Sequence, residues 1–420
     1  MKINIINVMA YSPAYELYSN EPRPEINWDT PDDQWVGIWG YDWEDMLGKE
    51  VLKLTDKFEY EVWQPDLRAD KIYSHTFENG LKHTLFPAVN QRKLYGFRLM
   101  NEVCSDSILK ELEKFSKDKK LILHLNSGIF GLTKEILAAS NNIPIVHSYR
   151  GVIQLPSTMF FSRTKNIFSK FNNIMDFFWL KRNINRIDII AYQNDINIKE
   201  LKKIYKGELK KITSGCDFSF WYPKDRKLAR KELELPADKK IFLCASNLIG
   251  LKQVDKGISI FTELSNKYDF LLIIAGHGTK NYENYLHNIA SDLLRKNKIK
   301  FVGYIRGKEL RQYYNACDLF LSTSRGEGGP VSVMNAFACE VPVISTKTGN
   351  TAELMEQYKC GCLLDINDYK MWRNELEKIL EGNKEVKVMD REIAKRYYHW
   401  PNIAQKFIDI YHKLFRKYYS

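Results

Sequence analysis

One segment of the chain, residues 318–354, combines residue types that can hold a charged ligand. It reads DLFLSTSRGEGGPVSVMNAFACEVPVISTKTGNTAEL. The apolar run at 319–322 predicts a buried strand, and the loop behind it includes Gly328 and Gly329, which let backbone approach a ligand closely. A helix beginning near Pro330 offers free amide groups and the positive end of its dipole. The pattern predicts a phosphate-binding loop, and its alternative is an ordinary glycine-rich turn.

The elements that must position this loop follow a strand–helix rhythm along the whole chain. Short apolar, β-branched runs alternate with longer helical patterns, which is typical of parallel sheets with crossover helices. We expect strands at residues 2–8, 60–64, 121–126, 143–149 and 187–193, and again at residues 241–245, 270–275, 299–302, 319–322, 341–345 and 362–364.

The length of the chain, 420 residues, exceeds the usual size of a single core and predicts two domains. We expect an α/β fold with Rossmann-like domains over residues 1–205 and 206–390 and a C-terminal helix within 391–420. A turn-rich stretch at 214–224 breaks the periodicity between the two sets of strands. In open α/β sheets ligands bind beyond the carboxyl ends of the strands, so the loops there should carry the chemistry.

The composition excludes several classes of protein. The formal charge of +11 comes from basic residues spread along the chain without a nucleic-acid motif, so we expect anionic small molecules or a membrane surface as partners and no nucleic acid. No run reaches the roughly 18 apolar residues of a membrane span. Seven scattered cysteines suit reduced thiols, so we expect a cytoplasmic protein, and no metal site even at the close pair Cys360 and Cys362.

The segment at 318–354 resembles the donor-binding signature of the family 4 retaining glycosyltransferases. That signature has a Glu, seven further residues and a second Glu, followed by an Ala-rich helix, a strand with Pro-Val and a closing loop that ends in Glu. Here Glu327 takes the first position, Asn335 replaces the second Glu, and Glu353 ends the closing loop. The resemblance implies the GT-B fold, with two facing Rossmann-like domains and a C-terminal helix that crosses back to the first.

The resemblance also implies how the loop would bind a donor. Glu327 would contact hydroxyl groups of the donor sugar beside Gly328 and Gly329. Asn335 would hydrogen-bond the ribose hydroxyls as a neutral amide. It would lack the charge that makes a hydrogen bond roughly twice as strong. Because Asn335 replaces the second Glu, we expect weaker donor binding, a different donor preference or loss of activity.

Further matches concern the diphosphate and the base. Lys256 matches the family's diphosphate-binding Lys. The family's Arg position falls at Ser246 or Asn247, and Lys252 is a candidate for the second positive charge. Cations there would stabilise the charge that the leaving diphosphate gains in the transition state. Gly303 and Tyr304 belong to the loop expected beside the base.

The first domain resembles the family mainly by architecture. His124, in LILHLNSG, is expected to follow a strand near the reacting sugar, with Asn126 in place of a second histidine. Core packing is the alternative for His124. Arg150 would meet an acceptor phosphate or carboxylate, or form a surface ion pair. Trp39 lies in an aromatic and acidic stretch, residues 22–48, whose rings either stack on a sugar or pack in the core.

We therefore expect a metal-independent retaining glycosyltransferase with no cofactor, a nucleotide-sugar co-substrate, and Glu327, Lys256 and His124 as catalytic residues. Its acceptor would be a glycan or a lipid-linked molecule in bacterial surface-polysaccharide or glycolipid assembly. Basic and apolar residues at 160–186 allow peripheral attachment to the inner face of a membrane, or pack on the sheet. The alternatives are a nucleotide-sugar epimerase of the same fold and a catalytically silent nucleotide-sugar or glycan binder.

Overall fold

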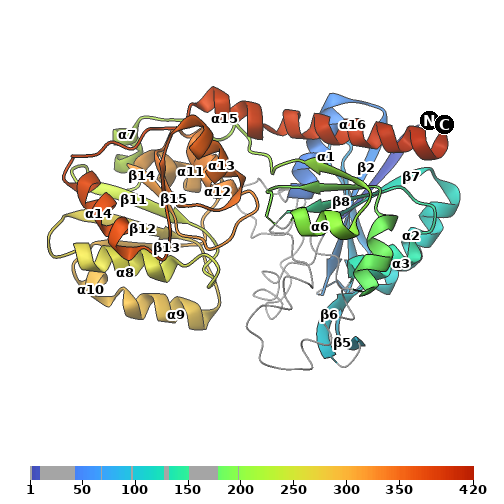
Figure 1. The fold of residues 1–420 in the computed structure, drawn as a ribbon, viewed down its shortest axis with the longest axis horizontal. Helices are drawn as coiled ribbons and strands as arrows, with labels where there is room; N and C mark the ends of the chain where they lie inside the picture. The colour runs from blue at the N-terminus through green and yellow to red at the C-terminus, as the bar shows by residue number, and fades with distance from the viewer. Residues whose placement is uncertain are drawn as a thin grey trace. The chain divides into compact units, whose positions relative to one another are not determined.

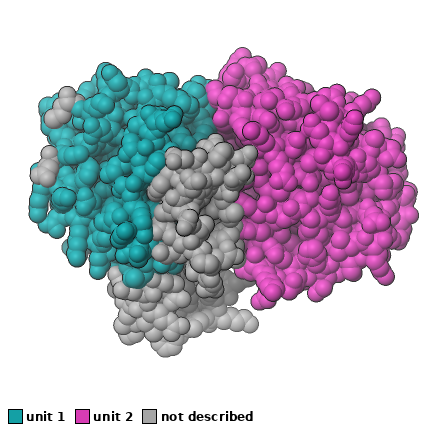
Figure 2. Space-filling view, turned by 180° about the vertical axis from the view of Figure 1, so that it is seen from behind, with its two compact units in different colours: residues 1–30, 35–213, 400–420 teal, residues 31–34, 214–399 magenta. Residues whose placement is uncertain are grey.

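The structure is a computed structural model that describes residues 2–9, 43–67, 69–95, 98–126, 132–150, 178–196 and 198–420. The chain divides into two compact units, drawn in different colours in Figure 2. Unit 1 holds the described residues up to Thr213 together with Trp400–Ser420, and the described part of unit 2 is Ser214–His399.

The units differ at two places from the domain limits expected above. Residues 206–213 belong to unit 1, because β10 (Glu208–Lys211) pairs with β9 (Ile189–Tyr192) in the first sheet. The C-terminal segment contains two helices instead of one. The first, α15 (Arg391–Tyr398), belongs to unit 2, and the second, α16 (Trp400–Tyr419), belongs to unit 1.

The sheet of unit 1 has eight strands in the order β10-β9-β8-β7-β1-β2-β4-β3. All its pairings are parallel except that of β3 with β4. Its further strands are β1 (Ile3–Val8), β2 (Phe58–Asp66), β3 (Tyr73–Thr76), β4 (Lys82–Pro87), β7 (Leu121–Asn126) and β8 (Ile145–Tyr149), and a separate hairpin joins β5 (Val89–Tyr95) to β6 (Arg98–Cys104). Its helical elements are α1 (Trp43–Leu54), α2 (Asp106–Asp118), α3 (Leu132–Ala139), η2 (Ile184–Arg186), α6 (Ile198–Ile204) and α16.

The final helix, α16, is part of the core of unit 1. Its apolar residues recur every three or four positions, so one stripe of the helix is apolar. That stripe, which includes Ile403 and Phe407, packs beside α1 and against Ile122 and Val146 of the sheet (Figure 1). The prediction that the C-terminal helix returns to the first domain is confirmed for α16.

The sheet of unit 2 has six parallel strands in the order β13-β12-β11-β14-β15-β16. They are β11 (Lys240–Ala245), β12 (Phe270–Ala275), β13 (Ile299–Gly303), β14 (Leu319–Ser322), β15 (Val343–Thr346) and β16 (Cys362–Leu364). Its helices are α7 (Arg226–Glu232), α8 (Val254–Leu264), α9 (Lys280–Ile289), α10 (Ser291–Arg295), α11 (Gly307–Ala316), α12 (Val331–Ala338), α13 (Gly349–Tyr358), α14 (Tyr369–Leu380) and α15.

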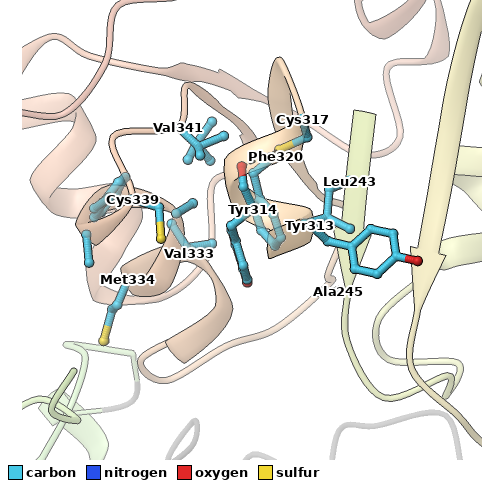
Figure 3. Packing of buried hydrophobic residues seen from close by; sticks show 14 of the residues in the cluster. Leu243, Ala245, Tyr313, Tyr314, Cys317, Phe320, Val333, Met334, Cys339 and Val341 are labelled. Atoms are coloured by element: carbon cyan, nitrogen blue, oxygen red, sulfur yellow. Dashed lines mark hydrogen bonds between the residues drawn. The ribbon is translucent and has the colours of Figure 1, made fainter. Parts of the chain in front are cut away.

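Apolar clusters cover both faces of the second sheet. Figure 3 shows part of one cluster, in which Tyr314 stacks on Phe320 with ring centroids 5.2 Å apart and Val333 of α12 packs in the same group. Burial of both faces explains why these strands read as continuous apolar runs in the sequence. No helix among the described residues is long and apolar enough to span a membrane.

Candidate functional site

The order of strands in unit 2 points to one edge of the sheet. From β11 the chain proceeds to β12 and β13 on one side, and then crosses to β14, β15 and β16 on the other. The direction therefore reverses between β11 and β14, and ligands of open α/β sheets bind beyond the carboxyl ends of the strands at such a point. The loops that leave these two strands are residues 246–253 and 323–330.

These two loops are bonded to each other. The backbone amide of Arg325 donates to the carbonyl of Leu251 at 2.9 Å, and the Thr323 hydroxyl donates to the carbonyl of Lys252 at 2.8 Å. Helix α12 then begins after Pro330 without a side-chain cap, so its first turn keeps amide groups for a ligand. An uncapped helix N-terminus behind such a loop can bind a phosphate.

A third loop fixes the glycines of this segment. The amide of Asn350, in the first turn of α13, donates to the carbonyl of Gly328 at 3.0 Å. Gly349 has a φ of 74°, and a Cβ atom there would lie 2.9 Å from the Cδ of Pro330. Only glycine fits this position without strain, which explains the glycine of the closing loop.

Glu327 and Lys252, which we predicted as separate donor contacts, lie together. The Lys252 Nζ donates to Glu327 Oε1 at 2.6 Å, and the two side chains are 22% and 13% exposed. The pair joins the loop after β11 to the loop after β14 at the point where the strand order reverses. It holds a carboxylate, which accepts hydrogen bonds from sugar hydroxyls, beside a cation.

Lys256 points to a different place. It lies in the first turn of α8, and its Nζ donates to Oδ1 of Asn367 at 3.2 Å. Asn367 follows β16, the edge strand two places beyond β14. Lys252 and Lys256 therefore have different partners, Glu327 and Asn367. Asn247 is exposed in the loop after β11.

Arg325 is a cation of this edge that the sequence analysis missed. It is exposed and lies two residues before Glu327 in the loop after β14. Arg325 stands between Ser324 and Gly326 in the segment at 318–354, and this position could have identified it from the sequence.

Asn335 is buried inside α12, at 6% exposure. Its side-chain Oδ1 accepts a hydrogen bond from the thiol of Cys216, 3.4 Å away, so the amide already uses one of its polar atoms within the protein. Burial raises the pKa of Cys216 well above its usual value, which keeps the thiol protonated as the donor.

The loops after β12 and β13 carry an aromatic pair. Tyr304 is 40% exposed, and its ring lies over that of His277 with centroids 4.8 Å apart. Gly303 ends β13 with a φ of 70°. Gly276 has a φ of 142° and touches the loop after β11, since a Cβ atom would lie 1.9 Å from the carbonyl oxygen of Ser246. The exposed ring is a surface on which a planar base can stack.

Glu353 is exposed one turn into α13, and its charge contributes to the raised pKa of buried Tyr398, whose main cause is burial. Among the residues that the structure describes, no group of three or more His, Cys, Asp or Glu side chains is placed to hold a metal ion.

His124 lies within β7, so the prediction that it follows the strand is wrong. It is fully buried, and its two ring nitrogens lie 2.7 Å from the hydroxyls of Tyr411 and Ser148. Burial, together with the charges of His147 and Arg150, holds its pKa well below the usual range. A neutral histidine with both nitrogens bonded links α16 to the sheet and is not placed to touch a ligand.

The other residues predicted on the acceptor side lie at or just after the ends of strands in unit 1, apart from Trp39, which lies outside the described residues. Asn126 ends β7, is buried, and donates to Oδ1 of Asn7 at 2.5 Å. Arg150 follows β8 and lies 2.7 Å from the buried carboxylate of Glu44, which belongs to the acidic stretch at 22–48 and was not predicted as its partner.

The comparisons with known proteins agree with this geometry. Residues 225–396, which contain all of β11 to β16, match the model of the family described as Glycosyl transferases group 1. The chain is 24% identical over 253 residues to a D-inositol 3-phosphate glycosyltransferase of Nocardioides sp., covering 55% of this chain and 54% of the relative. It is 27% identical over 193 residues to a GDP-mannose-dependent alpha-mannosyltransferase of Corynebacterium glutamicum, covering 46% and 44%. The chain thus spans about half the length of the curated relatives it matches.

Similar solved structures cover the whole chain. Sucrose-phosphate synthase from Thermosynechococcus elongatus superposes with a TM-score of 0.72 at 16% identity, over 99% of this chain and 100% of that one. Anabaena Alr3699/HepE in complex with UDP gives a TM-score of 0.66 at 16% identity, over 98% and 100%. At this identity the likeness concerns the fold, and the fold is GT-B.

Proposed function

We propose that the chain transfers a sugar from a nucleotide-sugar donor to a glycan or lipid-linked acceptor, because residues 225–396 match the model of the Glycosyl transferases group 1 family. The observation that carries this proposal is the Lys252–Glu327 pair, 2.6 Å apart, at the reversal point of the second sheet. Relatives of this chain are named as a D-inositol 3-phosphate glycosyltransferase and an alpha-mannosyltransferase, and the similar structure of Anabaena Alr3699/HepE was solved with UDP.

The donor would lie across the loops of this edge. Its diphosphate would meet the uncapped first turn of α12, with the exposed Arg325 as a cation. Its sugar would meet the carboxylate of Glu327, and its base would stack on Tyr304. Asn335, with Oδ1 occupied by Cys216, would offer the ribose mainly its amide N–H groups.

The reaction would break the bond between the sugar C1 and the diphosphate oxygen and form a bond from C1 to an acceptor hydroxyl oxygen. The hydroxyl proton would leave with the diphosphate or pass to water. Charge grows on the diphosphate in the transition state, so Arg325 and the helix amides would stabilise that state more than the ground state. We propose substitution on the same face of the sugar, without a protein nucleophile and without a metal or cofactor.

We further propose that the reaction belongs to surface-polysaccharide or glycolipid assembly at the inner face of a membrane. The support is the formal charge of +11, which attracts anionic surfaces. The basic and apolar residues at 160–186, which suggested attachment to a membrane, lie mostly outside the described residues.

The test is a thermal-shift and hydrolysis screen of the intact chain against UDP-, GDP-, ADP- and CMP-sugars. A donor at about 100 times its Kd stabilises the native state by about 2.7 kcal/mol. One nucleotide-sugar should raise the melting temperature and be slowly consumed, and Glu327→Ala should abolish consumption. Binding without consumption, with or without candidate acceptors, would favour a silent binder, and conversion of the donor to another nucleotide-sugar would favour an epimerase.

A further inference from the structure

Cys216 is held in place where the chain enters unit 2. Its backbone amide donates to the carbonyl of Tyr398, at the end of α15, at 2.7 Å. Two residues further on, the carbonyl of Phe218 accepts a hydrogen bond from Nη2 of Arg391 at 2.5 Å, and Nε of the same arginine donates to the carbonyl of Ala338 in α12 at 2.9 Å. Cys216 is buried, at 2% exposure. These bonds fix the thiol beside α12.

The thiol lies against Asn335 of α12. Its Sγ is 3.4 Å from Oδ1 of Asn335. Because burial raises the pKa of Cys216 well above its usual value, the sulfur keeps its proton and donates a hydrogen bond to the amide oxygen. The opposite orientation of the amide would place Nδ2 against the sulfur, which accepts hydrogen bonds only weakly, and would leave the S–H group without this acceptor. The contact therefore selects the orientation with Oδ1 at the thiol.

The amide nitrogen of Asn335 consequently points away from the thiol. Nδ2 makes no hydrogen bond with the residues that the structure describes, yet it is not among the buried atoms without a partner, so it remains accessible to solvent. Asn335 lies one turn after Val331, the first residue of α12, and residues four apart share a face of a helix, with side chains tilted toward its N-terminus. Val331 is 44% exposed. Nδ2 therefore opens toward the uncapped start of α12, which the proposed function assigns to the donor.

The nitrogen and the oxygen of an amide recognise different groups. An N–H group donates, so it needs an accepting oxygen, which a hydroxyl and a methyl ether both supply. A carboxylate only accepts, so it needs a hydroxyl that donates. With Oδ1 held by Cys216, Asn335 can recognise an oxygen of the ligand but not its hydroxyl proton.

We propose that Cys216 is a positioning residue of the donor site: its thiol fixes the amide of Asn335, so that the site recognises a ribose oxygen of the donor as a hydrogen-bond acceptor. This inference rests on the proposed function, because it places the ribose at Asn335. It adds a residue from outside the loops after β11 and β14 to those that determine donor specificity.

The first experiment tests the bond without a ligand, by infrared spectroscopy of the S–H stretching bands of the intact chain. The band of Cys216 is identified by its loss in Cys216→Ser. A thiol that donates a hydrogen bond absorbs at lower frequency than one that does not, so this band should move to higher frequency in Asn335→Leu. The control is the band of Cys317, whose thiol donates to the carbonyl of Tyr314 at 3.2 Å and should be unaffected (Figure 3).

The second experiment measures binding of UDP, GDP and ADP to the intact chain by calorimetry. Each nucleotide that binds is compared with its 2′-deoxy, 3′-deoxy, 2′-O-methyl and 3′-O-methyl analogues. At one of the two ribose positions, the deoxy analogue should bind about fivefold more weakly than the parent, because it lacks the accepting oxygen. The O-methyl analogue at that position keeps this oxygen and should bind within about twofold of the parent.

Variants of Cys216 test its role in this selectivity. Cys216→Ala removes the donor, so the amide can turn and the difference between the two analogues should fall below about twofold. Cys216→Ser keeps a donor and should restore the difference to about threefold or more. The matched control, Cys317→Ala, removes a buried thiol whose partner is Tyr314, and it should leave the difference unchanged. If Cys216→Ala does not fold, the infrared comparison carries the test, since it needs only Cys216→Ser and Asn335→Leu.

Three results would overturn the inference. They are a Cys216 band that does not move in Asn335→Leu, O-methyl analogues that lose as much affinity as the deoxy analogues at both positions, and equal effects of Cys216→Ala and Cys317→Ala on the difference. Failure of the proposed function would appear separately, as a wild-type chain that binds none of the three nucleotides and consumes no nucleotide-sugar.

Discussion

Replacing Lys252 with methionine tests whether the Lys252–Glu327 pair joins the two loops of the candidate donor site. Exposed ion pairs contribute about 0–1 kcal/mol, and hydrogen bonds to charged groups contribute about 1.5–3 kcal/mol. The two side chains are 22% and 13% exposed, which places this pair between those cases. We therefore expect Lys252→Met to lower the free energy of unfolding by about 1–2 kcal/mol, and salt should screen this partly buried pair only weakly.

The assay is thermal unfolding followed by circular dichroism, with a double-mutant cycle on Lys252→Met and Glu327→Gln. For a unit of this size the melting temperature should fall by about 2–8 °C, and the coupling between the two changes should be about 1 kcal/mol. The control is Lys256→Met, whose partner Asn367 is neutral and 3.2 Å away, with an expected cost under about 0.5 kcal/mol. Equal effects of Lys252→Met and Lys256→Met, or a coupling near zero, would refute the reasoning.

Three further predictions follow from single positions. Gly349→Ala combines a φ of 74° with a Cβ contact of 2.9 Å, so it should lower the free energy of unfolding, measured by urea titration, by at least about 2 kcal/mol. The control Gly382→Ala, at φ 76° with no atom within 4 Å of the added Cβ, should lower it by about 1 kcal/mol. Equal losses in the two variants would rule out the contact between Gly349 and the loop. Burial lowers the pKa of His147 to about 3, so the folded state binds fewer protons than the unfolded state below about pH 6.5, and stability should fall with falling pH by about 1.4 kcal/mol per unit for this side chain. His147→Leu should remove that share of the slope between pH 6 and pH 4, and an unchanged slope would contradict the assignment. Tyr304→Ala should raise the donor Kd about tenfold if the base stacks there, and an unchanged Kd would place the base elsewhere.

Much of the fold could be predicted from the sequence because central parallel strands are buried on both faces. Strands at 121–126, 319–322 and 362–364 have the bounds expected, since each is a continuous apolar run. The strands that were missed are β3, β4, β5, β6 and β10. β3 and β10 are short and half exposed, and β10 reads ELKK, so hydrophobicity gives no signal where backbone pairing alone makes the strand.

The sequence predicted which segments form the candidate site, but not which side chains in them pair with each other. The loop around Glu327 was identified from its glycines. Both Lys252 and Lys256 were predicted at the donor diphosphate, but which of them pairs with Glu327 depends on side-chain direction, which the spacing of residues does not give. His124 was misplaced because it is a polar residue in the largely apolar strand LILHLN, and only the hydroxyls of Tyr411 and Ser148, distant in sequence, explain how a core position accepts it. Glu44 was hidden among several acidic residues of one stretch, and its burial is a property of the fold.

Hydrogen exchange of the intact chain with and without a nucleotide-sugar tests the central claim most directly, with the donor taken from the UDP-, GDP-, ADP- and CMP-sugar panel. We predict slower exchange of amides in the loops at 246–253 and 323–330 and in the first turn of α12, and loss of that protection in Glu327→Ala. Protection confined to other parts of the chain, or no protection by any donor, would contradict the assignment of these loops as the donor site.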